Sequence, residues 1–180
     1  MTTESAAPVQ VGGAAAAADI PAVVRRLRQT FATGRTRSIE WRKEQLRALE
    51  RLITDNETAI ADALDKDLGR SPFEAWLADV ASTAGEAKSA AKSVGRWTKR
   101  RHRLLEMSQL PGRGWVEYEP YGTVLIIGAW NFPFALTLGP AVGAIAAGNT
   151  VVLKPSEAAP ASSALMAELA PRSLASDAIV

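Results

Sequence analysis

Cysteine is absent from this chain of 180 residues, and histidine occurs once, as His102. Without cysteine there is no disulfide, no thiolate metal site and no cysteine nucleophile. A single histidine also excludes a metal site built from several histidines, so we expect no bound metal. The sequence places no carboxylate or nucleophile to work with His102, which leaves little support for a general base at that position.

Net charge is low as well. The formal charge of +2 is too small to favour a nucleic-acid partner, despite an isoelectric point of 9.1. Basic residues do gather over 96–103, with Trp97 between them. Such a patch could bind RNA or an acidic membrane surface, but a solvated connection is the simpler interpretation. We therefore expect no nucleic-acid partner.

Long apolar runs are missing too. The longest one falls far short of the about 20 residues that a membrane-spanning helix needs, so we expect no transmembrane segment. The N-terminus has no basic region ahead of an apolar core and does not resemble a signal peptide. The default location is therefore the cytoplasm.

The composition is that of a globular protein, with 47% hydrophobic and 22% charged residues. A chain of this length can hold one ordinary domain or part of a larger one. Residues 1–19 are small and unpatterned, and we expect a mobile tail there. Residues 20–114 carry apolar residues at helical spacing, and residues 115–180 change to short apolar runs with a helix between them. We predict a helical part followed by the start of a sheet.

Start and stop signals divide the helical part. One helix is predicted over 20–33, ending at Gly34, and a second begins after Ser38, which can cap it. A third is expected to begin at Asp55 and to stop at Gly69.

Ser71-Pro72-Phe73-Glu74 combines a capping box with proline in the first turn, which is a specific helix start. A regular helical period assigns one buried face to the helix that follows. We expect that face to consist of Phe73, Trp76, Leu77, Val80, Ala84, Ala87, Ala91 and Val94. Farther on, residues 115–118 should form a short strand, antiparallel or bridging.

A strand–helix–strand unit closes the chain. Thr123–Ile127 is a continuous apolar, β-branched run, and residues 150–153 are a second one. Runs this short and this apolar suit strands buried on both faces of a parallel sheet. The segment 134–147 is long enough for a helix, with Pro133 at its start and Gly148 closing it. Two parallel strands with a crossover helix form a βαβ unit, so we predict an α/β fold.

The carboxyl ends of such strands are where parallel sheets bind ligands. Asn131 follows the first strand, and its amide can donate a hydrogen bond to a developing oxyanion. Spacing alone favours a turn residue at this position. Lys154 and Glu157 follow the second strand, where they can bond sugar hydroxyls or a phosphate. For them, spacing alone favours a solvated ion pair in a surface turn.

Two stretches resemble the aldehyde dehydrogenase superfamily. They read Glu-Pro-Tyr-Gly-Thr-Val-Leu-Ile-Ile-Gly-Ala-Trp-Asn-Phe-Pro, from Glu119, and Gly-Asn-Thr-Val-Val-Leu-Lys-Pro-Ser-Glu, from Gly148. The Tyr-Glu-Pro-Tyr-Gly around Pro120 is most similar to the fatty-aldehyde, class 3-like branch. The resemblance implies an incomplete aldehyde dehydrogenase fold, with a helical N-terminal part and the start of a Rossmann-like parallel sheet. It covers the N-terminal portion of the family's chain only.

The resemblance also implies roles for the residues at the strand ends. Asn131 would help to form the oxyanion hole, and Lys154 and Glu157 would contact the adenosine ribose of NAD or NADP. The groove for this cofactor would be lined by Ile127, Gly128, Ala129 and Trp130. No Gly-x-Gly-x-x-Gly fingerprint follows either strand, and the family binds its cofactor without one.

The family oxidises an aldehyde to a carboxylate through a cysteine thiolate and a downstream glutamate, both of which we expect beyond Val180. The next strand of the sheet would begin at 177–180, so the second βαβ unit is expected to be broken off and the catalytic domain missing. We therefore expect this chain alone to be inactive and to bind the cofactor weakly. The alternative is a non-catalytic cofactor-binding or interaction remnant that needs a partner fragment. Full-length relatives are expected to be homo-oligomers.

Overall fold

The computed structural model describes residues 19–180. The tail expected over 1–19 therefore lies outside the described residues except for Asp19, whose carboxylate accepts a hydrogen bond from the Ala22 N–H at 3.1 Å and caps the first helix. The elements are α1 Ile20–Ala32, η1 Arg35–Arg37, α2 Ile39–Thr54, α3 Glu57–Leu68, α4 Pro72–Ala75, η2 Trp76–Ala81, α5 Ser82–Trp97, β1 Arg101–Arg103, η3 Met107–Gln109, β2 Gly114–Val116, β3 Thr123–Ile127, α6 Pro133–Ala147, β4 Thr150–Lys154 and α7 Pro160–Ser173.

The predicted βαβ unit is present. Strands β3 and β4 are parallel, in register from Thr123 opposite Thr150 to Ile127 opposite Lys154, and α6 connects them. Beyond α7 the chain returns to the sheet on the free side of β4, where the Val180 N–H donates to the Val151 oxygen at 3.0 Å. A third parallel strand thus begins at the position expected from the sequence.

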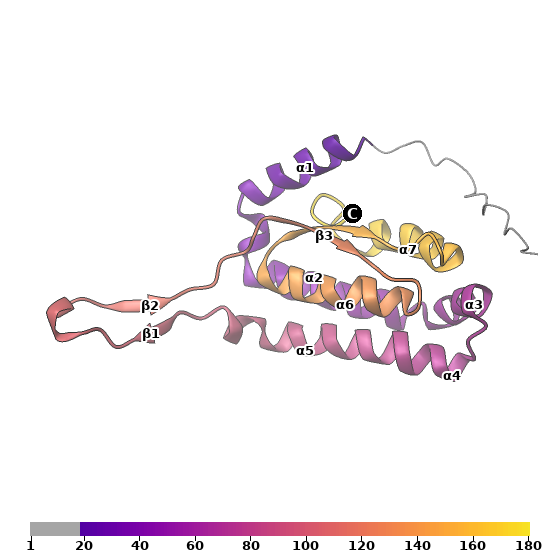
Figure 1. Ribbon diagram of the computed structural model, residues 1–180, viewed down its shortest axis with the longest axis horizontal. Coiled ribbons are helices and arrows are strands. Elements are labelled where there is room, and N and C mark those ends of the chain that lie inside the picture. The colour runs from indigo at the N-terminus through magenta and orange to yellow at the C-terminus, as the bar shows by residue number, and fades with distance from the viewer. Residues whose placement is uncertain (1–18) are drawn as a thin grey trace, which may run out of the picture.

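The helices pack in layers around the strand pair (Figure 1). Helices α2 and α6 lie between the strands and α5, while α1 lies on the other side of the sheet. The core forms where α2, α5 and α6 meet, because each contributes an apolar stripe. Its fully buried side chains include Leu46, Leu49, Ile53, Val94, Leu138, Val142 and Ile145.

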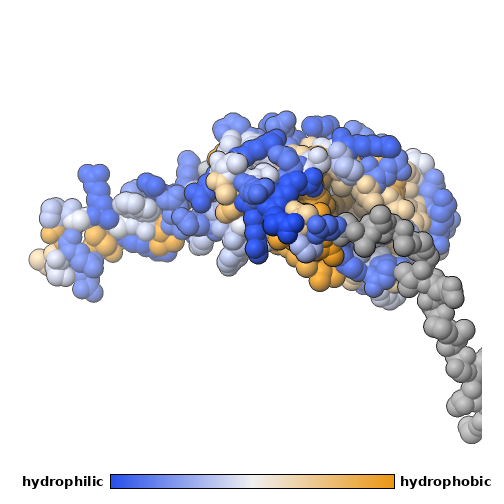
Figure 2. Space-filling view, turned by 90° about the horizontal axis from the view of Figure 1, so that it is seen from above, coloured by the Kyte–Doolittle hydropathy of each residue, from blue (hydrophilic) through white to orange (hydrophobic). Residues whose placement is uncertain are grey.

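The expectation that β3 is buried on both faces is wrong. Ile126 is buried against the core, but Leu125 and Ile127 are 58% and 68% exposed. Side chains alternate along a strand, so these two point to the face opposite α6. On that face the described chain supplies only α1, which leaves both side chains uncovered. Figure 2 shows hydrophobic surface open to solvent on the body of the molecule.

The capping box at the start of α4 is confirmed. Ser71 Oγ accepts from the Glu74 N–H at 3.3 Å, and the Ser71 N–H donates to the Glu74 carboxylate at 3.1 Å. Helix α3, in contrast, begins at Glu57, after Asn56, and not at Asp55.

The face predicted for the long helix is wrong in its first turns. Phe73, Trp76 and Leu77 are exposed, whereas Val80 and the alanines of α5 are buried as expected. The reason is η2, a π-helical stretch between α4 and α5. A π turn rotates each residue less than an α turn does, so a regular period carried through it points the first residues to the wrong side. Asp79 occupies the inward position instead.

Residues 101–116 form an arm that projects from the body (Figures 1 and 2). The strand expected at 115–118 is β2, which pairs antiparallel with β1, a strand that the sequence did not predict. The basic segment is solvated, and Arg100 pairs with Glu117 at 2.6 Å and lies 5.0 Å above the Trp115 ring. Glu117 therefore neutralises part of the positive charge of the basic segment.

None of the helices in residues 19–180 is both long and apolar enough to cross a membrane. No group of three or more histidines, aspartates and glutamates there could hold a metal ion.

Candidate functional site

Two loops leave the same edge of the parallel pair. At the carboxyl ends of the strands, Ile127 lies opposite Lys154, and the Gly128 N–H donates to the Lys154 oxygen at 2.9 Å. Asn131 lies in the loop after β3, and Glu157 lies in the loop after β4. The structure thus brings the predicted site residues to one edge of the sheet, where parallel sheets bind ligands.

Gly128 allows β3 and α6 to approach closely. A Cβ atom at this position would lie 1.9 Å from the Thr137 Oγ1 of α6, which is far below van der Waals contact. Thr137 is fully buried, so it has no free space to move into. Glycine at this position therefore lets the loop that leads to Asn131 begin without a clash between β3 and α6.

Helix α6 receives its N-terminal cap from another part of the chain. Pro133 is its first residue, and Phe132 before it makes no side-chain cap. The free N–H groups of Phe134 and Ala135 donate instead to the Asp79 Oδ1, at 3.1 and 2.9 Å. A carboxylate at a helix N-terminus is favoured both by these hydrogen bonds and by the helix dipole.

Arg70 links this carboxylate to the turn that carries Asn131. Its Nη1 donates to the Asp79 Oδ2 at 2.6 Å, and its Nη2 donates to the backbone oxygen of Asn131. The guanidinium also lies 4.3 Å above the ring of Phe132, a cation–π contact. One side chain therefore contacts two successive residues of the turn.

Asp79 is a buried carboxylate with a complete set of partners. Burial raises the pKa of its carboxyl, while the Ala135 N–H, the Arg70 guanidinium and the Phe134 N–H all act to lower that pKa. Its side chain has no exposed surface, and that of Arg70 is 17% exposed. The pair is thus largely shielded from solvent. Removal of one partner from such a pair is costly, because it leaves an unpaired charge in a buried position.

Sequence reasoning missed Arg70 and Asp79. The available signal was the run Trp-Leu-Ala-Asp-Val-Ala over 76–81, in which one carboxylate interrupts apolar residues. A charge on an apolar face indicates a buried partner elsewhere. The partner's identity was not available from spacing.

The loop after β4 is arranged differently. Lys154 and Glu157 form an ion pair with each other, and both side chains are about half exposed or more, at 49% and 69%. The hydrogen bond from Lys154 lowers the pKa of the Glu157 carboxyl, with help from the backbone. Helix α7 is capped by Asp67 of α3, whose carboxylate accepts from the N–H groups of Ala161 and Ser162 at 3.0 and 2.8 Å.

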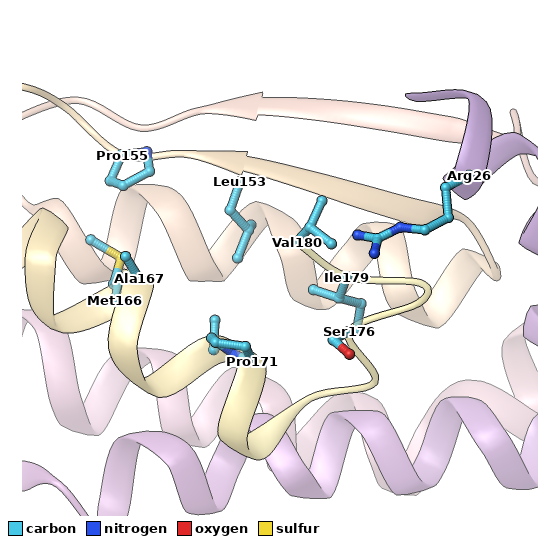
Figure 3. A pocket seen from close by; sticks show the side chains of 10 residues that line it. Arg26, Leu153, Pro155, Met166, Ala167, Pro171, Ser176, Ile179 and Val180 are labelled. Carbon is cyan, nitrogen blue, oxygen red and sulfur yellow. The ribbon is translucent and has the colours of Figure 1, made fainter. Parts of the chain in front are cut away.

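An apolar hollow of about 360 Å³ lies on the other side of β4 (Figure 3). The side chains around it come from β4, α7 and the last residues of the chain, with Arg26 reaching in from α1. They include Leu153, Pro155, Met166 and Ile179. Asn131 does not line this hollow, so the hollow is separate from the turn after β3.

Comparison with known proteins agrees with this geometry. The profile described as "Aldehyde dehydrogenase family" matches residues 3–177 of the chain. Aldehyde dehydrogenase family 3 member F1 of Arabidopsis thaliana is 44% identical over 156 residues, which make up 87% of this chain and 32% of that protein.

Solved structures give the same result. A structure titled as the substrate-bound state of Staphylococcus aureus AldH matches with a TM-score of 0.86 and 36% identity, over 89% of this chain and 35% of that one. A mutant of aldehyde dehydrogenase C (AldC) from Pseudomonas syringae, in complex with NAD+ and octanal, matches with a TM-score of 0.69 and 30% identity, over 84% of this chain and 30% of that one.

These matches confirm the incomplete aldehyde dehydrogenase fold, with its helical part and the beginning of its parallel sheet. The chain spans about a third of the length of these curated relatives, which include family 3 members from a plant and from mammals. The resemblance read from the two motifs after residue 118 is thereby confirmed. The chain belongs to the aldehyde dehydrogenase family.

Proposed function

We propose that the chain supplies one side of the cofactor groove and the oxyanion-binding turn of an NAD- or NADP-dependent aldehyde dehydrogenase, which oxidises an aldehyde to a carboxylate. The observation that carries the proposal is the common edge of β3 and β4. Asn131 follows β3 there, Lys154 is the last residue of β4, and Glu157 follows β4. Parallel sheets bind ligands at such an edge, so a dinucleotide and a reacting carbonyl could meet there.

The residues at this edge fit a nicotinamide dinucleotide. Lys154 and Glu157 are exposed and offer a donor and an acceptor for the hydroxyls of the adenosine ribose. Ile127 and Trp130 are exposed apolar side chains at the same edge, and with Gly128 and Ala129 they would line the groove. The cofactor would supply the acceptor for the hydride, and the chain would supply binding and orientation.

Asn131 is the catalytic candidate. It lies exposed in the turn between β3 and α6, with its backbone oxygen held by Arg70. The hydrogen bond from Arg70 holds the backbone that carries the side-chain amide, and this amide can donate to the aldehyde oxygen as negative charge develops on it. One such donor contributes about 3 kcal/mol to transition-state stabilisation.

The chemistry of the chain by itself is limited by the groups that it contains. It has no cysteine, so it cannot form the covalent thiol adduct from which hydride transfer proceeds. We expect no aldehyde oxidation and no thiol-dependent ester hydrolysis from the purified chain. With one side of the groove present, we expect it to bind NAD or NADP no tighter than about 1 mM.

Complementation tests this proposal. The purified chain is mixed with a separately expressed fragment that carries the remaining two-thirds of a family 3 enzyme, and NADH formation from an aldehyde is followed. We expect activity only with both pieces, and a loss of about 100-fold or more with Asn131→Ala. Activity that Asn131→Ala leaves unchanged would contradict the role of this residue. NADH formation by the chain alone would contradict its expected inactivity.

A non-catalytic binding role that requires a partner fragment is the second candidate. The exposed Leu125 and Ile127 and the apolar hollow beside Ile179 favour it, because a partner could cover these surfaces. We expect the isolated chain to bind a hydrophobic dye or to self-associate, and the partner to abolish this. Association with the complementing fragment without any NADH formation would favour this candidate over the enzyme.

A further inference from the structure

Arg70 and Asp79 of the helical part hold the turn that carries Asn131. We propose that they are positioning residues, which together fix the Asn131 turn against the start of α6. The proposal rests on the proposed function, because it takes Asn131 as the oxyanion donor. An oxyanion donor stabilises a transition state best when it is already in place. Contacts that fix its backbone should therefore increase this stabilisation.

The Asp79 side chain points toward the start of α6. Asp79 lies within the π-helical stretch η2, which turns its side chain inward. A regular α-helix would have turned neighbouring side chains inward instead. Single π turns are frequent at functional sites because they change which side chain faces a given direction. Here the turn aims a carboxylate at the free N–H groups of Phe134 and Ala135.

The two carboxylate oxygens of Asp79 bind different partners. Oδ1 accepts both N–H groups at the start of α6, while Oδ2 accepts the Nη1 of Arg70 at 2.6 Å. Asp79 is therefore the link between α6 and Arg70. Substitution can separate the cap of α6 from the bond to Arg70. Asparagine in place of Asp79 keeps one acceptor oxygen and replaces the other with an N–H donor.

Arg70 makes three contacts at once. Its guanidinium bonds the Asp79 carboxylate and the Asn131 oxygen at the same time and stacks on Phe132. A planar fork with fixed donors can make all three contacts, whereas the single ammonium of a lysine cannot. The turn is thus held both through the backbone of Asn131 and through the neighbouring ring.

Nuclear magnetic resonance and hydrogen exchange on the full 180-residue chain test the proposal. We measure amide exchange along the chain, the carbonyl carbon shift of Asn131 and the guanidinium N–H signals of Arg70. Arg70→Lys, Asp79→Asn and Asp79→Ala are compared with wild type. Arg172→Lys is the matched control, since Arg172 makes an exposed ion pair with Glu168 at 2.8 Å.

We expect the variants to separate the two links. In Asp79→Ala, exchange at Phe134 and Ala135 should rise at least about tenfold more than exchange in α2, whose amides report the loss of global stability. In Asp79→Asn the exchange at these two amides should stay near wild type, because one acceptor oxygen remains, but the Asn131 carbon shift should move. Arg70→Lys should move the same shift, and Arg172→Lys should move neither signal.

Two results would overturn the proposal. One is an Asn131 signal that stays unchanged in both Arg70→Lys and Asp79→Asn. The other is exchange that rises equally in α2, α5 and α6, which indicates a general loss of stability without local positioning. If Asp79→Ala does not fold, the two conservative variants still decide. These signals need no catalysis, so their failure is distinct from a failure of complementation.

Discussion

The two loops at the carboxyl edge of the sheet are fixed to different degrees. The turn at 130–133 is held by a largely buried arginine and a buried aspartate from the helical part. The loop at 155–159 is held at the start of α7 by Asp67, and its own charged pair lies in solvent. A donor that must meet a developing charge benefits from a fixed position, whereas contacts to sugar hydroxyls can form as the ligand binds.

The largest test of this difference removes the two capping carboxylates in turn. Asp79→Ala leaves Arg70 without its partner and two N–H groups without an acceptor. We expect a loss of about 3–5 kcal/mol in the free energy of unfolding. Asp67→Ala removes a helix cap alone and should cost about 1 kcal/mol. Urea unfolding of both variants measures the difference, and equal losses would show that the two loops are held alike.

A smaller effect is expected where the first loop begins. Gly128→Ala forces a methyl group onto Thr137, and overpacking of this kind costs about 1–3 kcal/mol. The control is Gly143→Ala in the middle of α6, where nothing lies within 4 Å of the added Cβ. That change should stabilise the chain by about 0.5–1 kcal/mol. Thermal melting gives the melting temperature of both variants. A shift of both temperatures in the same direction would contradict the close approach of β3 and α6 at Gly128.

The smallest effect concerns the charged pair of the second loop. The pKa of Glu157 is lowered mainly by Lys154. The ion pair therefore stabilises the fold at a pH above the ordinary glutamate pKa, and this stabilisation is lost as the pH falls through the lowered value. Lys154→Met should move the pKa of Glu157 back toward its ordinary value. The pKa of Glu74, which is lowered by Ser71, should not change. A titration of both carboxyl groups by nuclear magnetic resonance decides this, and an unchanged Glu157 would contradict the assignment of the cause.

Signals within one turn of the chain were reliable guides to the fold. The capping box of Ser71 and Glu74 forms as predicted, and Gly69 and Gly148 end their helices with positive φ angles of 64° and 92°. The strand pair and the helix between them also follow from short-range patterns of apolar residues. Each of these features is decided by backbone sterics or by hydrogen bonds between near neighbours.

Exposure was harder to predict, because it depends on what covers a residue. Leu125 and Phe73 are apolar and were expected to be buried, yet both lie in solvent. Leu125 faces the side of the sheet where only α1 packs, and Phe73 precedes a π turn that no spacing rule anticipates. Hydrophobicity indicates which residues gain from burial, but packing decides which of them achieve it.

The sequence by itself determined the family, the parallel strand pair and the positions of Asn131, Lys154 and Glu157 at the carboxyl ends of the strands. Only the tertiary structure decided what holds Asn131 in place. The Asp79 carboxylate and the Phe134 N–H are 55 residues apart, and their hydrogen bond exists only because the helical part and the sheet pack together. Sequence patterns report interactions within about one helical turn. A buried ion pair instead depends on how segments that are distant in the sequence pack together.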